Sequence, residues 1–311
     1  MSIFKKKSDP VPETDPDIII LKSTRPLECG GTDAYQEKNA PKTITSDEMT
    51  LFDVSSAFTT LVVDAEDRLD YVSAFAAPCA GGTFVLLEKR MLFSDNVSTC
   101  EWALVKENVF PKLTALVRER DIARNNGYHS RTHGLPQDFG GSIDIRYASG
   151  EQISISDNQS PILGYDAGLE IAGIFGEALK GERVALPDVS ALKAIRYAEE
   201  RDNGGFTRAT LTFAPDGTGV NAKASRYDDP TVYESEKPVD AETVEAIRAN
   251  IARTGIFAWA SLPESGYKFG PAKTLTFVFD DSEITVSGDR RVPMQIQNGF
   301  FNIELEMTTK H

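Results

Sequence analysis

The chain has 311 residues, of which 41% are hydrophobic and 9% aromatic, a composition typical of a folded soluble protein and not of a disordered one. Its formal net charge is −14, and such an acidic surface repels nucleic-acid phosphates and anionic lipid headgroups. We therefore expect no nucleic-acid partner and no membrane partner, and no stretch approaches the roughly 20 apolar residues of a membrane span.

The N-terminal stretch MSIFKKKSDPVPETDPD combines basic residues with prolines and acids, and no apolar segment follows its basic residues. It therefore lacks the pattern of a secretory signal, and we predict a disordered tail over residues 1–17. Cys29, Cys79 and Cys100 are odd in number and far apart, which argues against a disulfide framework and against a four-ligand zinc site. These features predict a cytoplasmic protein.

The first half of the chain predicts strands and two helices. An apolar stretch leads to a Gly-Gly pair at residues 81–82, which is typical of a turn. A helix opens with Pro111 at its first position and ends at Gly127. The alternating stretch 142–157 predicts a β-hairpin with one apolar face, and a further helix is expected over residues 166–180.

The second half predicts the same kinds of element. The Pro-Asp-Gly segment at residues 215–217 predicts a turn between two extended stretches. Asp240 is a good N-cap for a helix that stops at Gly255. Residues 274–287 predict another hairpin, whereas the pattern of residues 294–311 is compatible with a strand or with a short helix.

Several short segments of the first half recur in the second half in the same order. The spacing between the copies is 123 residues at the first match and 132 at the last, a drift that small loop insertions would produce. The matches are the Gly-Gly pairs at 81–82 and 204–205, the Ile-Ala-Arg segments at 122–124 and 251–253, the closing hairpins, and Pro161 with Pro293. This order predicts a tandem duplication.

Each copy predicts an antiparallel sheet with a helix packed on one face, because a two-stranded hairpin alone is only marginally stable. The expected fold class is therefore α+β, in two tandem related modules. We place the first module at residues 18–181 and the second at residues 182–311.

A resemblance covers most of residues 42–311. The lead-in KTITSDEMTLFDV, a Gly-Gly hairpin, a helix before a tryptophan and a closing hairpin that ends in GDRRVP resemble a domain common in bacterial proteins of unknown function. The first copy departs from that pattern, since it has His129 where a tryptophan is expected. The resemblance implies the fold and carries no assigned activity. The matching residues are Trp259, Asp280, Asp281, Gly288 and Pro293.

His129 and His133 are the candidate metal ligands, and they lie four residues apart in the segment GYHSRTHG. A glycine has just ended the preceding helix, and no glutamate of an HExxH motif lies between them, so the ligand set is incomplete. No P-loop, dinucleotide-binding or nucleophile-elbow motif is present either. We therefore predict no metal, no cofactor and no catalytic residue.

The predicted binding residues lie in two loops, 128–140 and 256–273, each between the helix of a module and its closing hairpin. Surface loops carry binding groups more often than the elements they connect, and aromatic and arginine side chains supply much of the binding energy at interfaces. Trp259 has an alternative interpretation as a core residue of its own module. The candidate residues are His129, Arg131 and His133 in the first loop and Trp259 and Tyr267 in the second.

Two classes of function follow. The first is a non-catalytic cytoplasmic protein that binds a protein or small-molecule partner. The second is a hydrolase-type enzyme with scattered carboxylates and the His129/His133 segment at the interface between the two modules. A deep pocket that gathers titratable side chains would favour the enzyme, whereas an open, well-packed surface between the modules without a cleft would favour the interaction protein.

Overall fold

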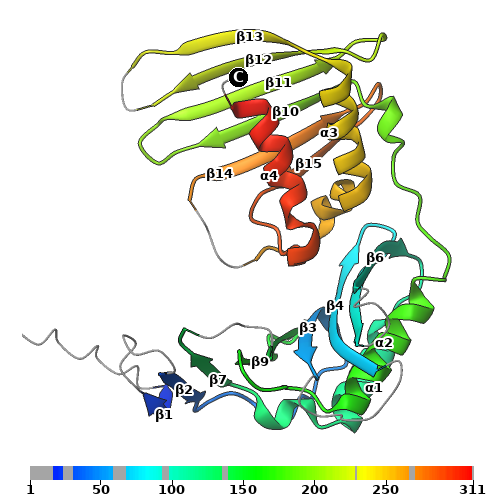
Figure 1. The fold of residues 1–311 in the computed structure, drawn as a ribbon, viewed down its shortest axis with the longest axis vertical. Coiled ribbons are helices and arrows are strands. Elements are labelled where there is room, and N and C mark those ends of the chain that lie inside the picture. The colour runs from blue at the N-terminus through cyan, green and yellow to red at the C-terminus, as the bar shows by residue number, and fades with distance from the viewer. Residues whose placement is uncertain are drawn as a thin grey trace, which may run out of the picture. The chain divides into compact units, whose positions relative to one another are not determined.

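The computed structural model describes residues 17–23, 31–58, 68–92, 98–134, 139–227, 230–265 and 270–309. Within these residues the chain forms two sheets and a small number of helices (Figure 1), as expected for the α+β class. The predicted tail lies outside the described residues except for Asp17.

The larger sheet has nine strands among the described residues, in the order β1-β2-β7-β9-β8-β3-β4-β5-β6. Its strands are β1 (Ile18–Ser23), β2 (Thr32–Glu37), β3 (Met49–Ala57), β4 (Arg68–Cys79), β5 (Gly82–Leu92), β6 (Ser98–Val105), β7 (Tyr128–Thr132), β8 (Gly141–Tyr147) and β9 (Gln152–Asp157). The helices of this half are α1 (Phe110–Glu119), the 3-10 helix η1 (Ile122–Asn125) and α2 (Tyr165–Ala178), followed by the short η2 (Val189–Ala191).

The smaller sheet has six strands, again counted among the described residues, in the order β13-β12-β11-β10-β14-β15. They are β10 (Ala194–Glu200), β11 (Phe206–Phe213), β12 (Gly219–Arg226), β13 (Tyr233–Val239), β14 (Ala272–Val278) and β15 (Glu283–Ser287). The helices are α3 (Ala241–Thr254), the 3-10 helix η3 (Ile256–Ser261) and α4 (Met294–Thr308). Figure 1 shows α3 and α4 on the same face of this sheet.

By compactness the described residues divide into two units. One comprises those within Met1–Val72, Arg90–Val97 and Pro111–Ile171, and the other comprises those within Ser73–Lys89, Ser98–Phe110 and Ala172–His311. The six-stranded sheet with α3 and α4 lies wholly in the second unit. The module boundary at residues 181 and 182 stays a prediction.

Both predicted hairpins are confirmed. In the first, β8 pairs with β9 so that Ile143 faces Ile155 and Ile145 faces Ile153. In the second, β14 pairs with β15, and Phe277 lies opposite Ile284. The apolar face predicted for the first hairpin is buried, since Ile145 and Ile153 are both 0% exposed.

The helix predicted from Asp240 to Gly255 is α3, and both of its ends are as expected. The Asp240 side chain accepts a hydrogen bond from the backbone N–H of Thr243 at 2.8 Å, as an N-cap does. Gly255 adopts a left-handed conformation with φ of 60° and ends the helix. Val244, Ile247 and Ile251 are buried on one face.

The C-terminal segment, whose sequence pattern is compatible with a strand or a helix, forms the helix α4. Ile296, Phe300, Ile303 and Met307 recur at helical spacing and are buried. The carbonyl oxygen of Met307 accepts a hydrogen bond from Nδ2 of Asn221 on β12 at 2.9 Å, so the last turn of α4 is tied to the sheet.

Three expectations for the first half are wrong. Residues 128–132 are the strand β7 and not part of a loop, because β2 and β9 pair with them on either side. The pairing of β7 with β9 is parallel, so the sheet is not purely antiparallel. The helix from Pro111 does not continue to Gly127, because Asp121 has a φ of 49° and breaks it.

No helix in the described part of the chain combines the length and the apolar character needed to cross a membrane.

Candidate functional site

Three predicted binding residues lie in β7 or directly after it, since His129 and Arg131 belong to the strand and His133 follows its last residue. Side chains two residues apart on a strand point to the same face, so His129, Arg131 and His133 lie in a row. Arg131 is exposed, whereas His129 and His133 retain 15% and 25% of their side-chain exposure. Of the other two predicted residues, Tyr267 lies outside the described residues and Trp259 is buried.

Both histidines contact acidic residues of the neighbouring strand β2. Nε2 of His133 lies 2.8 Å from Oδ2 of Asp33. Nε2 of His129 lies 3.3 Å from Oε1 of Glu37 without hydrogen-bond geometry. The His129 ring also packs against Tyr35, with ring centroids 5.0 Å apart. These contacts connect β2 to β7. In the part of the chain that is described, no group of three His, Cys, Asp or Glu side chains could hold a metal ion.

A serine completes an acid–histidine–serine arrangement around His129. Nδ1 of His129 lies 2.9 Å from Oγ of Ser156 on β9. Ser156, however, stands inside its strand and pairs with Ser142 on one side and His129 on the other. Its backbone is therefore part of the sheet, whereas an oxyanion hole needs N–H groups that point at the reacting atom. The contact of His129 with Ser156 is a cross-strand contact of the sheet.

Paired carboxylates occur beneath α4. The hydroxyl of Tyr197 lies 2.9 Å from Glu199 and 3.0 Å from Glu304. Each carboxylate also has a cation, since Arg201 lies 2.6 Å from Glu199 and Lys273 lies 2.6 Å from Glu304. Burial, together with the two carboxylates, raises the pKa of Tyr197 above its usual range. Because each carboxylate is paired with a cation and shares the Tyr197 hydroxyl, this cluster fixes α4 on the sheet.

The described cysteines are poor nucleophiles. Burial raises the pKa of the Cys79 thiol to about 11. The pKa of Cys100 is raised by burial and by the nearby Glu88 and Glu101. A thiol with a raised pKa is protonated at neutral pH and reacts slowly.

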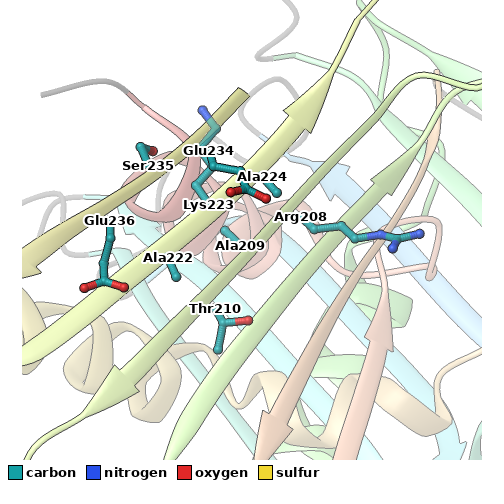
Figure 2. Close-up of a pocket in the computed structure, with 9 residues that line it drawn as sticks. All are labelled: Arg208, Ala209, Thr210, Ala222, Lys223, Ala224, Glu234, Ser235 and Glu236. Carbon is teal, nitrogen blue, oxygen red and sulfur yellow. The ribbon is translucent and has the colours of Figure 1, made fainter. Parts of the chain in front are cut away.

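A surface depression lies on the six-stranded sheet. Figure 2 shows that its lining residues come from the three adjacent strands β11, β12 and β13, and its volume is about 460 Å³. The lining residues are Arg208, Ala209, Thr210, Ala222, Lys223, Ala224, Glu234, Ser235 and Glu236.

Strand alternation and register assign these residues to the two faces of the sheet. Ala224 pairs with Arg208 and with Glu234, and Ala222 pairs with Thr210 and Glu236, so these six side chains share one face. Lys223 points to the opposite face, where its Nζ donates to the carbonyl oxygen of Thr308 on α4. The depression therefore lies on the face away from α4, and the two small alanines form its floor.

Two carboxylates border the depression without an ion-pair partner among the described residues. Arg208 forms an ion pair with Glu200 at 3.1 Å. Glu234 and Glu236 are exposed, and neither forms an ion pair with a described residue. This border of the depression is therefore negatively charged.

The strand that carries these carboxylates is an edge strand. β13 is the first strand of the six-stranded sheet and pairs only with β12 among the described strands. Every residue from Tyr233 to Pro238 is exposed. An edge strand of this kind presents backbone groups that can pair with another chain.

The direction of the backbone groups of β13 follows from the hairpin before it. The N–H of Ala214 donates to the carbonyl oxygen of Thr218 at 2.8 Å, which makes this a hydrogen-bonded pair of the β11–β12 ladder. By alternation, Ala222 and Ala224 direct their backbone groups towards β11, and the backbone groups of Glu234 and Glu236 point away from β12. Pro238, which has no N–H, also stands in an outward-facing position, as prolines of edge strands do.

The chain matches no known protein-family model and no curated protein. The site therefore has to be interpreted from its own chemistry. The sequence did not predict β13, because its residues, YESEKPV, lack apolar alternation. Pro238 could have indicated an edge strand, since prolines within sheets occur mainly on edge strands.

Proposed function

We propose that this chain is a non-catalytic cytoplasmic interaction protein that binds an extended segment of a partner protein along the outer edge of β13. The observation that carries the proposal is the combination of a fully exposed edge strand with an adjoining depression on the same three strands. A partner strand would gain backbone hydrogen bonds at Glu234 and Glu236 and would place alternate side chains beside the depression.

The side chains around the start of β13 support this mode of binding. Tyr233 and Tyr227 are 52% and 48% exposed, and their ring centroids lie 6.5 Å apart. Arg201 stacks on Tyr227, with its guanidinium carbon 5.0 Å from the ring centroid. Tyrosine and arginine side chains are enriched among the residues that dominate binding energy at interfaces.

The row of His129, Arg131 and His133 on β7 remains a second proposed contact surface of the same interaction protein. Arg131 is its most exposed member and the one whose substitution tests it. Replacement of Arg131 by alanine should weaken partner binding if this row takes part, and should leave binding unchanged if β13 alone does.

We further propose that the two halves arose by tandem duplication. The second half has the order hairpin β10–β11, strands β12 and β13, helix α3, 3-10 helix η3, hairpin β14–β15 and helix α4. The first half has the order β4–β5, β6, α1, η1, β8–β9 and α2, with β7 added. In strand order, β9-β8-β4-β5-β6 of the larger sheet corresponds to β15-β14-β10-β11-β12 of the smaller sheet, although β3 lies between β8 and β4. The strands β1, β2, β7 and β13 have no counterpart in this correspondence.

The experiment is affinity capture from the native lysate with three tagged forms: the unaltered chain, Glu236→Pro and Glu236→Ala. Proline removes an outward-facing N–H and leaves the ladder to β12 intact, whereas alanine removes the same side chain and keeps that N–H. We expect the proline variant to lose the partner and the alanine variant to retain it at least in part. If the proline variant folds, as judged by circular dichroism, and retains every partner, the proposed function is wrong.

A further inference from the structure

We infer that the partner segment which pairs with β13 is basic, with two lysine or arginine side chains separated by one residue. This inference rests on the proposed function and specifies the chemistry of the partner at the same site. It follows from three observations: the face on which the two β13 carboxylates lie, the absence of an ion pair between them and any described residue, and the charges that a second copy of β13 would place opposite them.

The carboxylates are placed to select a partner by charge. Glu234 and Glu236 lie on the same face, two residues apart, along the β13 border of the depression floored by Ala222 and Ala224. On an antiparallel partner strand, the residues directly opposite them would also lie two apart and on that same face. Long basic side chains at these two positions would stand directly beside the carboxylates and could pair with them.

A second copy of this chain does not fit the same edge. When two copies pair symmetrically and antiparallel through β13, residues that lie equally far before and after the central residue stand opposite one another. A centre at Ser235 places Glu234 opposite Glu236, and a centre at Glu234, Glu236 or Lys237 places that residue opposite its own copy. Like charges directly opposite one another destabilise a strand pair, so all four central registers are disfavoured.

Pro238 sets one limit to the paired segment. Because it has no N–H and faces outward, a partner strand loses a backbone hydrogen bond at this position. Pairing is therefore confined to the stretch from about Tyr233 to Lys237, which is long enough for the two outward-facing residues Glu234 and Glu236. The partner motif is accordingly short: a basic residue, any residue that tolerates an extended conformation, and a second basic residue.

The test uses three synthetic peptides of one length that alternate valine or threonine with lysine, with glutamine or with glutamate. Their binding to the full chain is measured by fluorescence anisotropy at low and at high salt. We expect the lysine peptide to bind about tenfold more tightly than the glutamine peptide at low salt, since two exposed ion pairs supply roughly this factor. The difference should shrink at high salt because exposed charges are screened.

Two charge variants complete the design. Glu234→Lys/Glu236→Lys should reverse the preference, so that the glutamate peptide binds best. Glu242→Lys/Glu245→Lys on α3 changes the net charge equally at exposed positions outside β13 and should leave the preference for lysine unchanged.

The outcomes separate the inference from the proposed function. If all three peptides bind equally and Glu236→Pro abolishes that binding, β13 is a docking edge and the inferred basic partner is wrong. If the α3 control reverses the preference as well, the selectivity comes from net charge and the inferred site is wrong. If no peptide binds under any condition, both the inference and the proposed function are contradicted.

Discussion

Individual side chains of this protein serve mainly to hold elements together, and Trp259 is the clearest example. It was one of the predicted binding residues, yet it is 2% exposed and its Nε1 donates to the carbonyl oxygen of Thr254 at 3.1 Å. The aromatic ring therefore fills the core beside α3, which is the alternative that the sequence left open. Its burial removes it from the proposed binding surface.

Replacement of Trp259 by alanine should lower the free energy of unfolding by about 3 to 5 kcal/mol, because it opens a large cavity in the core. Denaturant titration followed by circular dichroism measures the loss. A change below about 1 kcal/mol would show that the ring is not part of the core.

Glu151 supplies a prediction for the dependence of stability on pH. Its carboxylate accepts a hydrogen bond from the backbone N–H of Thr45 and others from Ser149 and Ser46, each at 2.9 Å. The backbone N–H of Thr45 is the largest cause of a pKa lowered to about 2. Because the pKa in the folded state lies below the ordinary value, the stabilisation is complete above about pH 4.5 and is lost as the pH falls towards 2.

We therefore expect Glu151→Gln to be less stable than the unaltered chain at pH 7, with a difference that narrows progressively below pH 4.5. Thermal unfolding across this pH range measures the difference. A gap in stability that stays constant down to pH 2 would contradict the role assigned to the carboxylate.

Helices and strands could be predicted where their own residues carry the information. The cap at Asp240 and the glycine at 255 define α3 without any tertiary information, and the apolar alternation of the two closing hairpins specifies their buried faces. Edge and polar strands were missed, because β7 and β13 are defined by pairing and not by burial. Their sequences, YHSRT and YESEKPV, carry no period-two pattern. The candidate site lies on β13, which is why sequence reasoning did not find it.

The crossing of α3 and α4 depends on a glycine. A Cβ atom at Gly299 would lie 2.7 Å from Oγ1 of Thr254, and the carbonyl oxygen of Gly299 accepts a hydrogen bond from Asn250 at 2.9 Å. Gly299→Ala should therefore lower the free energy of unfolding by about 1 to 2 kcal/mol, since overpacking outweighs the gain in helix propensity.

Gly176 in α2 provides the matched control, because a Cβ atom there meets nothing within 4 Å. Gly176→Ala should raise the free energy of unfolding by about 0.5 to 1 kcal/mol. Equal effects of the two substitutions, measured by chemical denaturation, would show that the helix crossing does not require a glycine.

At the scale of the whole molecule, charge determines which association is allowed. The net charge of −14 and the unpaired carboxylates of β13 both disfavour association of identical chains through this edge. Reversal of one of these charges should remove the repulsion between the β13 carboxylates of two copies. In Glu236→Lys, symmetric pairing centred on Ser235 places Lys at position 236 opposite Glu234 twice, so that two unfavourable pairs become favourable.

We expect Glu236→Lys to form a dimer whose population rises with concentration in sedimentation experiments, in contrast to the unaltered chain. The double variant Glu234→Lys/Glu236→Lys again places like charges opposite one another and should not dimerise. Dimerisation of both variants, or of neither, would contradict the register derived for β13.

Hydrogen exchange at the amides of Glu234 and Glu236, measured with and without the captured partner, tests the central claim most directly. Both N–H groups point away from β12, so they should exchange rapidly in the chain alone and slowly in the complex, when the partner strand accepts their hydrogen bonds. The amides of Ser235 and Lys237, which face β12, should change much less. If the partner binds while the amides of Glu234 and Glu236 exchange as before, and protection appears at another surface, β13 is not the docking edge and the account is contradicted.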